Sequence, residues 1–399
     1  MGDGTGLIPA FPLPDPSFHK RTKGPGGRFS TQVGARLLWS EVHLLIRTFQ
    51  WRDLLRLWRL RGRGQYLDLE RYVVAGYPLL RLAFRSWLVT DVRTYVGYVA
   101  SRRVWYLLQV VQREDRPEWD VSFLSPATAV SPPDIEQWQQ LVHRAVRDAL
   151  HKGVYRLYVS LPVESPFLSV FQKEGFRPYS HEVVYRTVQE VPPAQVATGY
   201  VRPYRPQDAW EFRRLWQRLT PHVIAVAEGF TAQNGLTIPY SWTPRGDNRI
   251  YLWLVNDTLC GAIAVRFGPQ GRWVRFLVDT ALGDAVSSFV AWGMHQAAMG
   301  WRGPIYCALP QHVGGVTGTL DALGFTPFLE RILLVRHLAV ALQADATAAQ
   351  SVLSWLEIGG EPAFSRSLEP PIPIQCRCDC GCGEPAMVEH RTKQWRFTC

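Results

Sequence analysis

The C-terminal end of this 399-residue chain contains its densest group of residues that could bind a metal. Five of the seven cysteines lie there with one histidine: Cys376, Cys378, Cys380, Cys382, Cys399 and His390. Structural zinc sites favour two residues between cysteines, whereas a Cys-x-Cys run suits soft metals held by thiolates. An unstructured tail with exposed thiols is the other interpretation. We favour the unstructured tail and expect no metal site.

Three smaller groups of residues could act in acid–base or nucleophilic chemistry. They are Glu164, His181 and Glu182; Tyr306, Cys307 and His312; and Glu228 and Gln233. The first group could form a base site, although charged turn residues are a common alternative. In the second group the thiol would need a base and electropositive surroundings to react. In the third group a carboxylate could bind a cation, although the length of the connection alone also explains it.

The elements that would position these residues occur twice along the chain, which is the strongest signal in the sequence. Each block opens with a short strand and an acid that begins a helix, in IRTFQWRDLLRLWRL and VRPYRPQDAWEFRRLW. The matching positions are Arg47 and Arg202, Phe49 and Tyr204, and Asp53 and Asp208. An Asp at a helix start accepts hydrogen bonds from backbone N–H groups. Capping therefore explains both acids without a catalytic role.

Each block continues and closes in the same way. Three strands follow the first helix, and Trp119 corresponds to Trp273. Amphipathic helices are predicted over Asp134–Lys152 and Gly283–Met299 from the spacing of apolar residues. A helix then ends at Gly175-Phe176 or at Gly324-Phe325, where glycine permits the left-handed conformation that terminates a helix. The predicted order is strand, helix, three strands, helix, strand, helix, strand, in both blocks.

The order of elements and the closing phrases FQKEGFRPYSHEVVYR and LDALGFTPFLERILLVR resemble the GNAT superfamily of acyl-CoA-dependent N-acyltransferases. The resemblance covers about residues 37–342, as two units in tandem. It implies an α/β fold with a mixed sheet that is splayed at its centre, where acyl-CoA lies. Amides of the fourth strand, near Phe123–Ser125 or Leu277–Asp279, would polarise the thioester carbonyl. A Gly-rich loop before the next helix would bind the pyrophosphate.

The sequence departs from the family pattern at the pyrophosphate loop. The first copy has SPATAVSPPDIEQW, with no glycine, the adjacent Pro132 and Pro133, which lack N–H groups, and Asp134 as the expected helix cap. The second copy has VDTALGDAVSSF, where Gly283 is the only glycine and Asp279 and Asp284 would repel a phosphate.

The acid–base residues of the family pattern are also replaced. Many members have a Tyr that protonates the leaving thiolate, and Phe171 and Leu320 stand at those positions. Glu164 replaces an Asn of the pattern. Catalytic and cofactor-binding residues therefore stay unassigned, and the second copy, with Gly283 and no proline pair, is the better candidate for activity.

The resemblance and the composition define five segments. They are a disordered basic arm over 1–35, GNAT-like units over 36–190 and 199–342, a helix and Pro-rich linker over 343–375, and the Cys-rich tail over 376–399. The hydrophobic content of 47% predicts packed cores, and no apolar run is long enough to span a bilayer. The start of the chain lacks the pattern of a signal peptide. We expect a cytoplasmic, bacterial protein that makes no membrane contact.

Two functions compete. In the first, the protein transfers an acyl group from acetyl-CoA, as co-substrate, to a primary amine. In the second, it is a non-catalytic module that binds an acidic or nucleic-acid partner. The net charge is +10, but no single Lys/Arg block dominates the chain, and heavy Arg use is also a habit of GC-rich genomes. The second function would use the basic arm and the Arg-rich first helix, with interleaved aromatic residues that could stack on bases. These residues are Arg52, Arg56, Arg59, Arg61 and Arg63, with Trp51, Trp58 and Tyr66. Trp51 and Trp58 are seven residues apart, so they could equally belong to the core.

Overall fold

A computed structural model describes most of the chain between residues 44 and 338. The described residues are 44–60, 63–76, 83, 91–113, 116–127, 132–229, 238–244, 246 and 248–338. They all lie in one compact unit. The arm, the expected helix after residue 343, the Cys-rich tail and Gln233 lie outside the described residues.

The first half of this unit contains the elements predicted for one repeat, with an additional helix. In chain order they are β1 (Leu44–Thr48), α1 (Leu54–Leu60), β2 (Gln65–Tyr66), α2 (Leu69–Ala75), β3 (Val92–Val99), β4 (Val104–Gln112), β5 (Glu118–Ser125), α4 (Pro132–His151), β6 (Arg156–Pro162), α5 (Leu168–Lys173) and β7 (Arg177–Thr187). Helix α2 and the short strand β2 were not predicted. They lie between the first helix and the three central strands.

The second half repeats this order. Its elements are β8 (Tyr200–Pro203), α6 (Ala209–Leu219), α7 (His222–Ala227), β9 (Asn248–Val255), β10 (Thr258–Phe267), β11 (Arg272–Val278), α8 (Asp284–Ala298), β12 (Ile305–Pro310), α9 (Thr317–Ala322) and β13 (Thr326–His337). Helix α7 occupies part of what the sequence suggested was one long connection. Trp119 and Trp273 are each the second residue of equivalent strands, β5 and β11.

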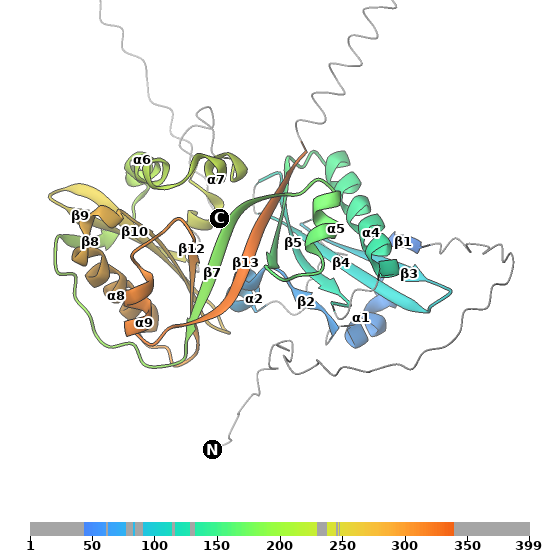
Figure 1. Ribbon diagram of the computed structural model, residues 1–399, viewed down its shortest axis with the longest axis horizontal. Coiled ribbons are helices and arrows are strands. Elements are labelled where there is room, and N and C mark those ends of the chain that lie inside the picture. The colour runs from blue at the N-terminus through green and yellow to red at the C-terminus, as the bar shows by residue number, and fades with distance from the viewer. Residues whose placement is uncertain are drawn as a thin grey trace, which may run out of the picture. The chain divides into compact units, whose positions relative to one another are not determined.

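The two halves share one 13-stranded sheet in the order β1-β3-β4-β5-β6-β13-β7-β12-β11-β10-β9-β8, and β2 pairs with β5 beside this path. The last strand of each half is exchanged. Strand β13 pairs with β6 of the first half, whereas β7 pairs with β12 of the second half. Figure 1 shows β7 and β13 as two long antiparallel strands lying side by side between the halves.

Each half has one parallel strand pair, and the two strands separate after a few residues. Strands β5 and β6 are paired from Glu118 to Asp120, and β11 and β12 from Arg272 to Arg275. Neighbouring strands elsewhere in the sheet are antiparallel. The predicted mixed sheet with a splayed centre is therefore present in both halves. This arrangement is two GNAT-like units in tandem.

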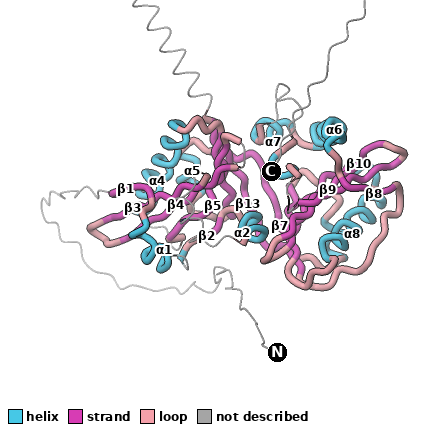
Figure 2. Tube along the Cα trace, turned by 180° about the vertical axis from the view of Figure 1, so that it is seen from behind, coloured by secondary structure: helices cyan, strands magenta, loops and turns pink. Residues whose placement is uncertain are grey.

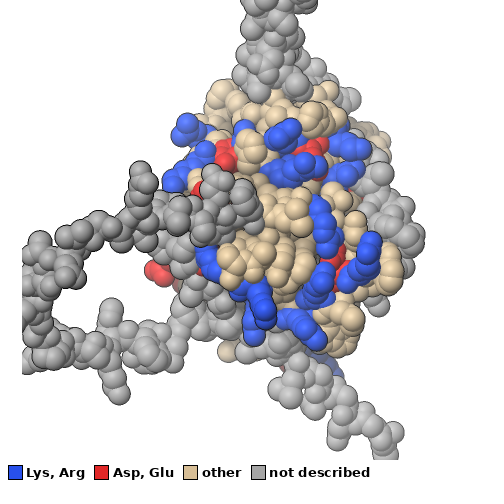
Figure 3. Space-filling model, turned by 90° about the vertical axis from the view of Figure 1, so that its right-hand side faces the viewer, with Lys and Arg blue, Asp and Glu red and all other residues tan. Residues whose placement is uncertain are grey.

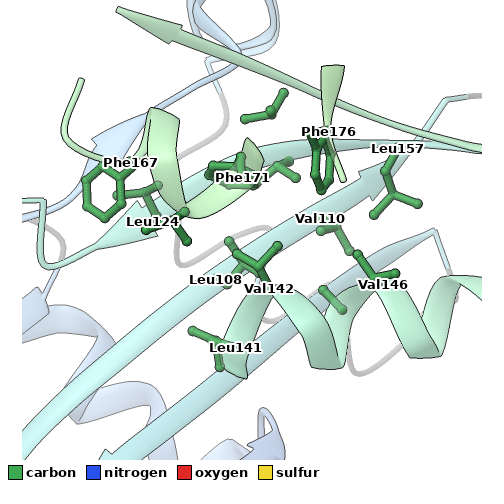
Figure 4. Packing of buried hydrophobic residues seen from close by; sticks show 14 of the residues in the cluster. Leu108, Val110, Leu124, Leu141, Val142, Val146, Leu157, Phe167, Phe171 and Phe176 are labelled. Atoms are coloured by element: carbon green, nitrogen blue, oxygen red, sulfur yellow. The ribbon is translucent and has the colours of Figure 1, made fainter. Parts of the chain in front are cut away.

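The helix after the central strands and the short helix that follows it build the core of each half. In the first half, α4 contributes Leu141, Val142 and Val146, which pack against Leu108 and Val110 of β4 (Figure 4). Phe171 of α5 and Phe176, which immediately precedes β7, close this core with their rings 5.1 Å apart. Gly175 and Gly324 have φ angles of +82° and +76°, so both end their helices in the left-handed region as predicted.

The acid at the start of each first helix is buried and bound in the same way in both halves. Asp53 accepts two hydrogen bonds from Arg47, of 2.6 and 2.7 Å, and one from the Gln50 N–H. Asp208 accepts hydrogen bonds of 2.6 and 2.8 Å from Arg202 and one from the Arg205 N–H. The predicted capping role is confirmed, and the matching arginines, which the sequence left unexplained, are the partners of these acids.

Candidate functional site

A cavity of about 610 Å³ lies where the exchanged elements of the two halves meet. Helix α2 of the first half packs against the second half, because Leu69, Val73 and Val74 share a buried cluster with Trp273 and Tyr306. Figure 2 shows α2 beside β7 and β13. Conversely, Ala227 at the end of α7 packs on Tyr158 of the first half, whose hydroxyl donates to the Ala227 carbonyl. Both halves therefore contribute walls to one cavity.

The points at which the parallel strands separate both face this cavity. Asp120 is the last β5 residue paired with β6, opposite Tyr158. Arg275 is the last β11 residue paired with β12, opposite Ala308. The side chains of Asp120, Tyr158 and Arg275 line the cavity. The cavity therefore lies beside both strand separations, where the resemblance placed the expected acyl donor.

Buried ion pairs connect the two halves across the cavity. Glu182 of β7 accepts hydrogen bonds of 3.1 and 2.6 Å from Nε and Nη2 of Arg331. Arg275 donates to Glu182 at 3.3 Å and to Glu70 of α2 at 2.7 Å. Arg266 also binds Glu70, at 2.8 Å. Burial acts to raise the pKa values of Glu182 and Glu70, but the facing arginines lower both pKa values below the ordinary range.

A second ion cluster lies on the first-half side of the cavity. Arg113 donates to Asp120 at 2.8 Å, and its guanidinium stacks 3.5 Å from the ring centre of Tyr158. Arg71 of α2 binds Asp68 at 2.9 Å, Asp120 at 3.4 Å and the Tyr240 hydroxyl at 3.4 Å. Each guanidinium group is held by hydrogen bonds to carboxylates, and that of Arg113 also stacks on a tyrosine ring. These contacts hold this wall of the cavity in a fixed arrangement.

Glu228, which follows α7, is the acid in the cavity with the most unusual environment. Neither a hydrogen bond nor an ion pair joins its carboxylate to any described residue. Burial raises the pKa of Glu228 to about 7, and the charges of Arg113 and Arg275 oppose this rise, while Glu182 and Glu118 add to it. A carboxylate with this pKa can accept a proton near neutral pH.

In the first half, a strand of the same chain lies at the edge of β5 where the resemblance placed the acyl donor. Strand β2 pairs with the outer edge of β5, with Gln65 opposite Leu124 and Tyr66 opposite Phe123. Hydrogen bonds on both sides extend this pairing, from Leu67 N–H to the Ser122 carbonyl and from Ala127 N–H to the Arg63 carbonyl. Because pairing alternates along a strand, the Leu124 amide faces β2 and the amides of Phe123 and Ser125 face β4, so all three amides that the resemblance assigns to the thioester face strands of the same chain.

Gly64 permits this close approach of β2 to β5. A Cβ atom at this position would lie 2.0 Å from the Phe123 ring and 2.8 Å from the Leu124 carbonyl oxygen. Real Cβ atoms do not come this close to a neighbour, so a larger residue would push the strand away. This pairing could not be predicted from the sequence, because residues 63–67 have no repeated counterpart.

The equivalent edge of the second half is open. Among the described residues, no strand pairs with this edge of β11 beyond Arg275. The Asp279 amide donates to the Cys260 carbonyl of β10. Because antiparallel pairing alternates along a strand, the Leu277 amide also faces β10, and the amides of Phe276 and Val278 face the open edge. Within the predicted range Leu277–Asp279, only Val278 is thus placed to bind a carbonyl there.

In the first half, the loop that the resemblance assigns to the pyrophosphate leads directly into α4. Helix α4 begins at Pro132, so Asp134 lies in its first turn and is not the cap that the sequence suggested. Its carboxylate accepts hydrogen bonds from Tyr106 at 2.6 Å and from Arg102 at 3.0 Å. Residues 128–131 of this loop are outside the described residues.

In the second half, local hydrogen bonds use most of the loop amides. Asp279 accepts from the Ala281 N–H at 3.2 Å, and the amides of Leu282 and Gly283 donate to carbonyls of the same turn. The Asp279 carboxylate also pairs with Arg218 at 3.1 Å. Asp284 at the start of α8 is exposed. The amides of Ala281, Leu282 and Gly283 are therefore bonded within the loop, and the charge of Asp279 is partly compensated.

The structure separates two of the groups of residues that the sequence suggested. Glu164 and His181 are exposed, whereas Glu182 is buried in β7 among arginines. His181 and Glu182 are neighbours on a strand and so point to opposite faces. The proposed base site and the alternative of charged turn residues are both wrong for Glu182. Cys307 is fully buried, and burial raises the pKa of its thiol, so it is not a reactive thiolate.

Sequence reasoning missed most residues of the cavity. Phe171 and Leu320 are buried in the cores, in line with the loss of an acid at both positions. Glu228 was recognised only as an acid in a long connection. Glu70 and Arg275 are 205 residues apart in sequence and gave no joint signal. Among the described residues, no cluster of His, Cys, Asp or Glu is arranged to hold a metal, and no helix is long and apolar enough to cross a membrane.

No protein-family model matches the sequence, and no curated protein matches it. Among solved structures, a GCN5-related N-acetyltransferase from Sphaerobacter thermophilus is similar over 74% of this chain and 96% of its own, with 11% identity and a TM-score of 0.47. A tandem GNAT protein from the clavulanic acid biosynthesis pathway is similar over 74% of this chain and 99% of its own, with 12% identity and a TM-score of 0.41.

A third similar structure is a GCN5-related N-acetyltransferase from Anabaena variabilis. The similarity covers 74% of this chain and 73% of that chain, with 11% identity and a TM-score of 0.36. The conclusion that this chain has a tandem GNAT-like fold rests on its own strand order and on the two parallel pairs that separate.

Proposed function

We propose that this protein transfers an acyl group from acyl-CoA to an amine bound in the cavity. The observation that carries the proposal is Glu228, a cavity carboxylate without a described partner whose pKa is raised to about 7. An amine must lose a proton before it attacks a thioester, and Glu228 is suited to accept that proton. Arg275 stands at the strand separation and is close enough to influence Glu228, which brings base and donor position together.

The donor belongs in the second half in this proposal. Its open β11 edge presents the Val278 amide, which would bind the thioester carbonyl oxygen as charge develops on it. In the reaction Glu228 takes one proton from the ammonium group, the amine nitrogen then bonds to the carbonyl carbon, the C–S bond breaks, and the second proton that the nitrogen loses passes to water. Because Phe171 and Leu320 offer no proton, CoA would leave as a thiolate, which is stable enough near neutral pH to do so.

Acyl transfer from acetyl-CoA to a panel of amines tests this function directly. Glu228→Gln keeps the size of the side chain and removes the base, so we expect kcat/KM to fall by a factor of 10² to 10⁴. Glu164→Gln is the matched control, because Glu164 is exposed and outside the cavity. No acyl transfer to any amine, or equal rates for the wild type and Glu228→Gln, would reject the proposal.

A second candidate function is supported by the surface of the first helix. Trp51, Leu55 and Trp58 are 66%, 79% and 57% exposed, so the two tryptophans are not core residues. Figure 3 shows a face of the molecule that is rich in Lys and Arg. In the second half the positions equivalent to these three residues are Pro206, Trp210 and Arg213. Because the fold is the same there, it does not require tryptophans at the positions of Trp51 and Trp58.

We infer that this surface could bind a single-stranded nucleic acid, with the rings stacking on bases and the arginines contacting phosphates. Fluorescence anisotropy of a labelled oligonucleotide would measure this binding. The double substitution Trp51→Ser and Trp58→Ser should weaken binding at least tenfold, whereas Trp210→Ser in the second half should not. Equal affinities of the wild type and the first-half variant would reject this function.

A further inference from the structure

Two stripes of exposed side chains run along α1 and the 3₁₀ turn Trp51–Asp53 that precedes it. The basic stripe consists of Arg52, Arg56 and Arg59. The apolar stripe consists of Trp51, Leu55 and Trp58. Each set has the i, i+4, i+7 spacing of one helix face, and neighbouring positions are rotated by about 100° around the helix. The two stripes therefore lie side by side.

The β3–β4 hairpin borders the basic stripe. The guanidinium carbon of Arg56 lies 4.2 Å from the centre of the Trp105 ring. Trp105 of β4 pairs with Tyr98 of β3, and their ring centres are 4.3 Å apart. The turn between the two strands adds Arg102 and Arg103, which are both exposed. The basic stripe thus has aromatic rings on both sides, and the hairpin extends the basic surface beyond α1.

The second half has an equivalent hairpin with different side chains. Leu254 and Leu259 form the pair equivalent to Tyr98 and Trp105, and they are only 5% and 8% exposed. The residues at the positions of Arg52, Arg56 and Arg103 are Gln207, Glu211 and Asp257. Because the second half folds in the same way without basic or aromatic side chains at these positions, the fold itself does not explain their presence in the first half.

A single-stranded nucleic acid matches this alternation of guanidinium groups and rings. Arginines contact its phosphates, and aromatic rings stack on its unpaired bases. Trp105 already contacts Arg56 and Tyr98, so it fixes both neighbours in place. The ring of Tyr98 is better placed to receive a base, because its partner in β1 on the other side, Leu45, is 65% exposed. The paired bases of a duplex would leave no face for such stacking.

We propose that a single strand bound to α1 continues across the β3–β4 hairpin, where a base stacks on Tyr98 and Arg103 contacts a phosphate. This inference rests on the second candidate function, because it takes the strand on α1 from it. The backbone follows the basic stripe, with bases stacking on Trp51 and Trp58 on one side and on Tyr98 on the other.

Two substitutions test the hairpin part of this path. Tyr98→Leu introduces the residue type of the equivalent Leu254, and Arg103→Gln removes a charge at an exposed turn position. Fluorescence anisotropy of a labelled oligothymidylate with the full chain measures the affinity at several salt concentrations. Tyr98→Leu should weaken binding about fivefold or more and keep the salt dependence. Arg103→Gln should make the slope of log K against log salt concentration shallower by about 0.7, the value for one phosphate contact in a single strand.

Arg214→Gln is the matched control and should change neither the affinity nor the slope. Arg214 is an exposed arginine of α6 at the position equivalent to Arg59, and it stacks on Trp210 at 4.7 Å. A wild-type affinity of Tyr98→Leu, or a wild-type slope of Arg103→Gln, would overturn the proposed path. If the double substitution of Trp51 and Trp58 still weakens binding in that case, the second candidate function stays intact and only this inference is removed.

Other ligands test the class of partner. A duplex of the same length should bind at least tenfold more weakly than the single strand, and equal affinities would overturn the proposal, because the bases of a duplex cannot stack on Tyr98. Binding of the protein to anionic phospholipid vesicles, without binding to the oligonucleotide, would assign the surface to a membrane and would overturn the proposal as well.

Discussion

Glu182 and Arg331 occupy equivalent positions in the two repeats, and they form a salt bridge with each other. They are 149 residues apart, the same separation as Gly175 and Gly324, and they lie opposite each other in the β7–β13 register. Both are only 4% exposed, and the shortest N–O distance is 2.6 Å. Opposite charges at one repeated position thus allow two exchanged strands to pair where like charges would repel.

This pair should contribute to stability as a unit. Glu182→Gln leaves Arg331 buried without its anionic partner, and we expect the free energy of unfolding to fall by about 3–5 kcal/mol. The double substitution Glu182→Leu and Arg331→Leu should cost less than either single substitution, because no unpaired charge of this pair then remains buried. Urea unfolding of the three variants measures this. A double variant less stable than both single variants would contradict the interpretation.

The arginine–aspartate pairs at the two helix starts should be equally important. Arg47→Ala and Arg202→Ala each remove two hydrogen bonds to a buried carboxylate, so each should cost about 1.5–3 kcal/mol in thermal or urea unfolding. Arg59→Ala, on an exposed position of α1, is the control and should stay within about 0.5 kcal/mol of the wild type. A large effect in only one repeat would show that the repeated motif is not equivalent in the two halves.

Gly64 should be essential for the placement of β2. Gly64→Ala is expected to destabilise the protein by about 1–3 kcal/mol, because the added carbon meets Phe123 and the Leu124 carbonyl. Hydrogen exchange of the Leu67 amide, which is bonded to Ser122, should become faster. Gly318→Ala in α9 meets no atom within 4 Å and should be neutral or slightly stabilising. Unchanged exchange at Leu67 in Gly64→Ala would contradict this account.

The raised pKa of Glu228 predicts opposite pH trends for activity and stability. A base must be ionised, so kcat/KM should rise with pH up to about 7 and then level off. The folded state holds the proton more tightly than the unfolded state, whose carboxyl has an ordinary pKa of 4.5. Stability contributed by this group is therefore lost as pH rises from 4.5 to about 7, by up to about 3 kcal/mol.

Glu228→Gln should separate these two trends. The variant should lose the acidic limb of the activity profile and should be more stable than the wild type at pH 8, where the wild-type carboxylate is ionised. At pH 4 the two proteins should differ little. Titration of the carboxyl by NMR would check the assignment directly, and a pKa near 4.5 would refute it.

Acetyl-CoA should bind at one site per chain. The first-half edge is paired with β2, whereas the β11 edge is open, so calorimetry should give a stoichiometry of one.

Asp284→Asn should tighten acetyl-CoA binding a few-fold, and the gain should shrink with added salt, because an exposed like charge is removed. Asp279→Asn should have a smaller effect, since Asp279 is already paired with Arg218. A stoichiometry of two would contradict the closed first half.

The sequence by itself determined the repeat and the order of its elements. Apolar spacing identified the helices that became α4 and α8, and the glycines at 175 and 324 marked helix ends that the φ angles confirm. The placement of Asp53 and Asp208 at helix starts could also be predicted. These features depend on residues close together in sequence, whose spacing directly encodes local conformation. The absence of the family's Gly-rich loop, and of a tyrosine at positions 171 and 320, could be seen in the sequence for the same reason.

Only the tertiary structure decided which strands and helices pair. Strands β7 and β13 have similar sequences, so pairing within one repeat or across the two repeats would satisfy the same backbone hydrogen bonds. The choice was made by contacts between residues far apart, such as Glu70 with Arg275 and Glu182 with Arg331. That choice brings both halves to one cavity and gives Glu228 its surroundings. A carboxylate acquires an unusual pKa from its burial and its neighbours, and neither can be derived from its position in the chain.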